Sequence, residues 1–127
     1  MAVSNTVQDP RMNQQQYVRL VLDCYRRTPE TVGHVRPADR RMAIELYKRR
    51  IPLSVVKAAL ILATARRMFR PPESAPLATV RSMHYFVPVI DEILNKPLHP
   101  DYVQYLRSKI DKQLDRQRGE AGYNSTP

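Results

Sequence analysis

A near-apolar run between two arginine clusters constrains the fold of this chain most. The segment RRIPLSVVKAALILATARRMFR, residues 49–70, carries only one charged residue, Lys57, between Ile51 and Ala65. A helix that is apolar on all sides is buried in the middle of a bundle. The run therefore predicts a central, buried helix over residues 53–69. Burial does not by itself account for the arginines at its two ends.

The same run is too short to cross a membrane. It is 15 residues long and contains Lys57, whereas a spanning helix needs about 20 apolar residues. The opening residues, MAVSNTVQDP, have neither the basic nor the apolar segment of a secretory signal. Cys24 is the only cysteine, so an internal disulfide is impossible, as suits a reducing compartment. We therefore expect a soluble, cytoplasmic protein that makes no membrane contact.

Apolar periodicity and prolines divide the chain into five expected helices. Apolar residues recur at helical spacing, and prolines after the first and second segments stop those helices. No strand pattern and no internal repeat is evident, so the predicted fold class is all-α, a single compact bundle. The expected domain covers residues 12–118, with flexible tails at 1–11 and 119–127. The expected helices cover residues 13–27, 37–50, 53–69, 80–95 and 100–118.

Pro88 makes the fourth of these helices ambiguous. Apolar residues keep the helical period on both sides of this proline, from Met83 to Leu94. A proline inside a helix removes one hydrogen bond and crowds the preceding turn. We therefore expect one proline-kinked helix over residues 80–95. A break into two pieces at Val87 is the alternative.

Residues with catalytic or metal-binding chemistry are few. Neither Cys24 nor the three histidines have the spacing of metal ligands. The chain has three glycines and no glycine-rich phosphate loop. Asp91 and Glu92 are adjacent, and adjacent helical residues do not face each other. We expect no enzyme, no bound metal and no cofactor.

The net charge of +9 is unevenly distributed along the chain. Between Arg19 and Arg81 there are 14 basic and 5 acidic residues, whereas the rest of the chain has 7 of each. A basic excess on one part of a surface is typical of proteins that bind a polyanion. An arginine-rich protein without such a ligand would have the same composition, so the placement of the arginines decides between the two.

Topology predicts that many of these arginines share one pole of the bundle. Short connections make consecutive helices antiparallel neighbours, so the ends of the first and third helices meet the starts of the second and fourth. Basic residues favour helix C-termini, but this number exceeds what helix dipoles require. Dense arginine suits phosphate contacts, which carry no base information. The predicted nucleic-acid-binding residues are Arg26, Arg27, Arg36, Arg40, Arg41, Arg66, Arg67, Arg70 and Arg81.

The arginines after the apolar run are expected to face solvent. Replacing Arg66, Arg67 and Arg70 with glutamine should then preserve folding. The basic residues 48–50 are expected at the opposite end of the bundle and should matter less for binding. A standard helix-turn-helix over residues 43–60 is disfavoured, because a recognition helix needs polar side chains and the third helix is apolar.

The C-terminal helix suggests a second class of function. Val103, Leu106, Ile110 and Leu114 form the narrow stripe expected of a coiled-coil-like seam. Packing on its own bundle is the explanation that we favour for this stripe. Docking of a larger protein partner through the same four residues is the alternative, and it would make the chain a protein-interaction adaptor.

Two segments carry a resemblance to known proteins. RPADRRMAIELYKRRIPLSVVKAALILATARRMFR and VRSMHYFVPVIDEIL, within residues 17–95, resemble small bacterial helical proteins associated with mobile elements. The IPLSVVKAAL turn is distantly similar to DnaD-type replication accessory domains. The resemblance implies an accessory role in replication, recombination or transposition. Together with the charge, it predicts a non-enzymatic basic module that binds nucleic acid, with DNA favoured over RNA.

Overall fold

The computed structural model describes residues 12–124, and their side chains through Gly119. The described part confirms the all-α class, with five α-helices and one 3-10 helix. Its only β pairing is an isolated bridge between Thr31 and Val80. The predicted tail at residues 1–11 lies outside the described residues. The elements are α2 (Gln14–Arg26), α3 (Pro37–Lys48), α4 (Leu53–Met68), η1 (Met83–Phe86), α5 (Val87–Asn95) and α6 (Pro100–Asn124).

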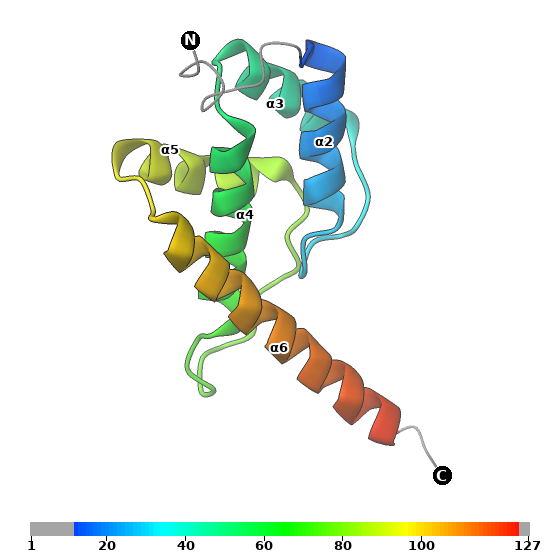
Figure 1. The fold of residues 1–127 in the computed structure, drawn as a ribbon. Helices are drawn as coiled ribbons and strands as arrows, with labels where there is room; N and C mark the ends of the chain where they lie inside the picture. Colours follow the sequence, from blue (N-terminus) through cyan, green and yellow to red (C-terminus); the bar gives the residue numbers. More distant parts are fainter. Residues whose placement is uncertain (1–11, 125–127) are drawn as a thin grey trace.

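Helix α4 is the centre of the bundle, as predicted from its apolar sequence. It contacts α2, α5, α6 and η1, and Figure 1 shows it running between α2 and α5, with α6 crossing its lower half. Val56 and Ala59 are fully buried, and Leu60 is 4% exposed. Lys57 lies at the surface and is the only charged residue in the first three turns of the helix. The apolar run is therefore core on nearly every side.

A tight turn joins α3 to α4. Arg50 adopts a left-handed conformation with φ of 59°, directly after the helix ends. The amide of Arg50 donates to the carbonyl of Tyr47 (2.9 Å), and the amide of Ile51 donates to that of Leu46 (3.1 Å). This pair of bonds is a Schellman motif, which satisfies carbonyls at a helix end. The hydroxyl of Tyr17 donates to the Ile51 carbonyl (2.7 Å) and fastens α2 to the turn.

The expected kinked helix over residues 80–95 is wrong. The backbone of Val80 is extended and exchanges hydrogen bonds with the connection after α2: its amide donates to Glu30 (2.8 Å) and its carbonyl accepts from Val32 (2.9 Å). The 3-10 helix η1 follows, and α5 begins at Val87. Pro88 therefore lies in the first turn of α5, where its missing N–H is not needed. The alternative of a break at Val87 matches the structure.

Helix α6 is longer than expected. It continues past Arg118 to Asn124, so the predicted tail begins too early in the sequence. At 1.5 Å per residue its 25 residues span about 37 Å. Its first half packs on α4, and its second half projects beyond the rest of the bundle (Figure 1).

Candidate nucleic-acid interface

Asp39 organises the start of α3. Its side chain is fully buried at the third position of the helix. One carboxylate oxygen accepts from the Arg36 amide (2.9 Å), and the other accepts from the Met83 amide (2.8 Å). The first bond caps α3, and the second ties α3 to η1 across 44 positions of sequence. The Thr31–Val80 bridge adds a further contact, so three distant segments meet at this junction.

Tyr25 is a second buried polar residue near this junction. Its hydroxyl is buried and has no hydrogen-bond partner among the described residues. Burial raises the pKa of its phenol above the ordinary value of 10.0, and the Asp39 carboxylate raises it further, whereas Arg36 opposes the shift. The ring of Tyr25 meets that of Phe86 edge to face, with centroids 6.1 Å apart. The interior beneath the junction is thus aromatic and closely packed.

Three arginines belong to the backbone segments that meet at this junction, and we call them the junction patch: Arg36, Arg40 and Arg81. All three are exposed. Arg40 lies one helical turn after Arg36. Arg81 comes two residues before Met83. The backbone amides of Arg36 and Met83 both donate to the Asp39 carboxylate, which joins the two segments. No carboxylate of the described residues forms a salt bridge with any of the three. The patch therefore presents three cationic side chains on backbone segments that the Asp39 hydrogen bonds hold together.

Arg41 and the arginines at the end of α2 lie apart from this patch. Arg41 is exposed and lies about 200° around α3 from Asp39, on the outer face of the helix. Arg26 and Arg27 both pair with Asp23, the latter at 2.8 Å. The Asp23 carboxylate offsets part of their charge, so these two offer less free charge to a ligand.

Arg66 faces a different side of the molecule. Its guanidinium donates to both carboxylate oxygens of Glu92, at 2.9 Å and 2.6 Å, and links α4 to α5. These hydrogen bonds hold the pKa of the Glu92 carboxyl below its ordinary value of 4.5. Both side chains are half exposed, so the pair is a surface contact.

Arg67 is not the solvent-facing residue that the sequence predicts. Its side chain is 6% exposed, and its guanidinium donates to Glu30 (2.8 Å), to the Ala78 carbonyl (2.6 Å) and to the Tyr85 hydroxyl (3.2 Å). Arg70 donates to the Ala75 carbonyl (2.8 Å). These arginines hold the proline-rich loop after α4 against the bundle. The expectation that Arg67 faces solvent is therefore wrong, and we now expect its replacement to lower stability.

The nine predicted arginines thus divide into groups with different surroundings. Successive side chains on a helix point 100° apart, so Arg66 reaches Glu92 on α5 whereas Arg67 reaches Glu30. The connection between α2 and α3 climbs back beside α2 in Figure 1, so α3 begins away from the C-terminal end of α2. The structure gathers Arg36, Arg40 and Arg81, and it engages most of the others in internal contacts.

The apolar stripe on α6 packs within its own bundle, as we favoured. Leu106 and Ile110 are 6% and 5% exposed, and α6 packs on α4. Val103 and Leu114 are half-buried against the same core. The stripe is not an open face, so the adaptor hypothesis loses the docking surface on which it was based.

Other chemistry is sparse in the described part of the chain. It contains no group of three or more histidine, cysteine or acidic residues able to hold a metal ion. Cys24 is a free, half-buried thiol. It lies in the wall of a groove of about 370 Å³ that also includes Lys57, Arg107 and Asp111. Within residues 12–124, no helix is both long and apolar enough to cross a membrane. The expectation of a non-enzymatic protein stays a prediction.

Comparison with protein-family models, with curated proteins and with solved structures finds no match for this chain. The proposal of a function therefore depends on the arrangement of its own residues.

Proposed function

We propose that this protein is a non-enzymatic module that binds nucleic acid through phosphate contacts. The junction patch of Arg36, Arg40 and Arg81 is the primary contact. One observation supports this above the others: the three arginines are exposed around one rigid junction, and no carboxylate of the described residues pairs with them. A planar guanidinium donates through several N–H groups and suits phosphate oxygens.

The distribution of charge supports the same function. The whole net charge of +9 derives from the segment between Arg19 and Arg81, which includes the patch. Phosphate neutralisation by arginine releases counterions and provides most of the affinity for nucleic acid without sequence reading. Duplex DNA is the first ligand to test. An accessory role in replication, recombination or transposition stays a prediction, as does a cytoplasmic location.

The test compares two variants that lose equal charge. The patch variant has all three patch arginines replaced with glutamine. The control variant replaces three other exposed basic residues that form no ion pair within the described chain: Arg19, Lys48 and Arg50. Fluorescence anisotropy of a labelled duplex near physiological salt gives the affinities. We expect the affinity of the patch variant for the duplex to fall about tenfold or more, and that of the control variant to fall much less.

Two results would contradict this proposal. Equal losses from the patch and control variants would indicate diffuse attraction to a basic protein, with no defined site. Absence of binding by the wild-type protein to both duplex and single-stranded DNA near physiological salt would exclude the nucleic-acid function. The adaptor hypothesis would then need a surface other than the buried stripe of α6.

A further inference from the structure

Helix α6 presents an aromatic and cationic stripe that the proposed function leaves unused. Tyr102, Tyr105, Lys109, Lys112 and Arg116 follow one another at spacings of three and four residues, which places them on one face of a helix. All five side chains are exposed. From first to last the stripe runs about 21 Å along the helix axis.

One carboxylate, that of Asp101, borders this stripe at its first residue, and none lies along the cationic part. On a helix of 3.6 residues per turn, Asp111 and Asp115 lie at least about 100° from the centre of the stripe. Asp115 also pairs with Arg118. Asp101 lies only about 60° from that centre, but it stands at the start of the helix, about 12 Å of axial rise before Lys109, with an oxygen 3.7 Å from Nδ1 of His99. The three cations therefore act together on one side of α6.

The two tyrosines form an exposed aromatic pair. Their ring centroids are 6.2 Å apart and their planes differ by 26°, a stacked arrangement. The side chain of Tyr102 is 47% exposed and that of Tyr105 is 55% exposed. Large exposed aromatic side chains that are grouped together mark interaction sites on soluble domains more often than single exposed ones do.

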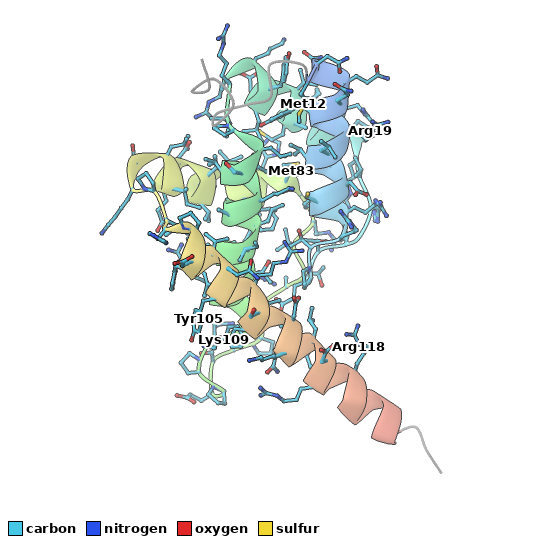
Figure 2. All side chains as sticks on the ribbon, viewed as in Figure 1. Met12, Arg19, Met83, Tyr105, Lys109 and Arg118 are labelled. Carbon is cyan, nitrogen blue, oxygen red and sulfur yellow. The ribbon has the colours of Figure 1, made fainter. Side chains whose placement is uncertain are left out.

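Lys109 links the tyrosine pair to the cations. Its ammonium lies 4.4 Å from the ring centroid of Phe69 and 6.0 Å from that of Tyr105. Figure 2 shows Tyr105 and Lys109 on the same side of α6. Cation–π contacts hold the ammonium in place without neutralising it, because no carboxylate of the described residues pairs with it. A positive charge is thus fixed beside the exposed ring of Tyr105 and the half-buried ring of Phe69.

An open groove of about 510 Å³ lies along the stripe, between α4, α5 and α6. Tyr102 and Lys109 of α6 line it, together with Lys96, which directly follows α5. Arg66 is also in its wall, although Glu92 offsets its charge. The first part of the stripe, at Tyr102 and Lys109, therefore borders a hollow that also contains a second lysine, Lys96.

We propose that the α6 stripe binds single-stranded nucleic acid. Bases stack on Tyr102 and Tyr105, while Lys109, Lys112 and Arg116 contact the phosphates that follow. Aromatic side chains combined with a cationic track are how proteins bind single strands without sequence preference, because every base has a π face. A duplex keeps its base faces covered, so it cannot use the tyrosines. This inference deepens the proposed function and rests on it, since it names the form of nucleic acid.

The test separates base stacking from charge. Wild-type protein, Tyr102→Leu/Tyr105→Leu and Tyr102→Phe/Tyr105→Phe are titrated with a labelled oligo-dT strand and with a duplex of the same length. We expect the leucine variant to lose about tenfold or more in affinity for the single strand. It should bind the duplex within about twofold of wild type, because stacking plays no part there. The phenylalanine variant keeps the rings and should bind both ligands like wild type.

Tyrosine fluorescence gives a second readout, because the chain has no tryptophan. Stacking of bases should quench part of the wild-type emission on addition of oligo-dT, and the leucine variant should lose that quenching. Thermal unfolding of each variant shows whether α6 remains packed. If the leucine variant is unfolded, Lys109→Gln/Lys112→Gln/Arg116→Gln is used instead, with the same predicted loss for the single strand.

The other outcomes distinguish failure of the single-strand inference from failure of the proposed function. Unchanged single-strand affinity in a folded leucine variant overturns this inference, and patch-dependent duplex binding would leave the proposed function standing. If single-strand binding depends on the tyrosines and duplex binding does not depend on the junction patch, this inference is supported and the patch is excluded as the duplex contact. Tighter binding to a poly-glutamate peptide than to oligo-dT overturns the inference in favour of an acidic protein partner. Failure to bind either oligonucleotide overturns both.

Discussion

Asp39 is a buried carboxylate that serves two backbone donors from distant segments. Replacing it with asparagine leaves one acceptor oxygen and turns an amide nitrogen toward the second donor. One buried N–H is then unsatisfied, which costs about 1–3 kcal/mol. We expect Asp39→Asn to lower the free energy of unfolding by that amount in urea denaturation. Glu45→Gln, an exposed change on the same helix, should stay within about 0.5 kcal/mol of wild type. Equal stability of both variants would show that the Asp39 bonds contribute little.

Arg66 and Arg67 are sequence neighbours with opposite roles. Arg67 is 6% exposed and donates to Glu30, Ala78 and Tyr85, whereas Arg66 is half exposed on Glu92. Arg67→Gln removes hydrogen bonds from a buried site and should lower the free energy of unfolding by about 1–3 kcal/mol. Arg66→Gln removes an exposed ion pair and should cost less than about 1 kcal/mol. Thermal or urea unfolding measures both, and a larger loss for Arg66→Gln would contradict the structure.

Single-residue roles were the least predictable part of this chain. Asp39 lies in the first turn of a helix, where an acidic residue suits the helix dipole, but its second hydrogen bond depends on Met83, which is 44 positions away. Arg67 has the same sequence context as its neighbours, and only the path of the following loop shows that it is buried. Periodicity indicates which face a residue occupies and leaves its partners open.

At the scale of elements, the apolar pattern and the prolines predicted the helices whose position depends on local sequence. Helix α4 was predicted well because it is apolar on nearly every side. The fourth helix was mispredicted because Pro88 suits either a kink or a first turn. The pairing of Val80 with residues 30–32 decides between them, and that contact is not local.

The turn between α3 and α4 contains an unfavourable backbone conformation at Arg50, which a substitution can relieve. Arg50 has a φ of 59°, which is unfavourable for a residue with a side chain and natural for glycine. We expect Arg50→Gly to raise the free energy of unfolding by about 0.5–1 kcal/mol. Lys48→Gly is the matched control: Lys48 is the last residue of α3 and forms no ion pair among the described residues, so glycine there should lower the free energy of unfolding by about 0.5–1 kcal/mol. Urea denaturation of both variants checks the prediction, and a loss of stability in Arg50→Gly would contradict this turn geometry.

At the scale of the whole molecule, the junction patch and the α6 stripe occupy different elements. The patch belongs to the start of α3 and the segment before η1, and the stripe belongs to α6. The uneven charge of the sequence predicted a polyanion as ligand. It did not predict which arginines stay free, because ion pairs such as those of Asp23 and Glu92 form only in the folded chain. The stripe itself is visible in the sequence as tyrosines and cations at helical spacing, but it lies in a part of the chain where basic and acidic residues are equal in number.

The salt dependence of duplex binding tests the central claim most directly. Each lost phosphate contact removes about 0.9 from the slope of log affinity against log salt concentration on duplex DNA. If Arg36, Arg40 and Arg81 each contact a phosphate, replacing all three with glutamine should flatten the slope by about 2.7. The Arg19, Lys48 and Arg50 control should keep close to the wild-type slope. Parallel lines for wild type and the patch variant would show that the three arginines do not contact phosphate, and would contradict this account.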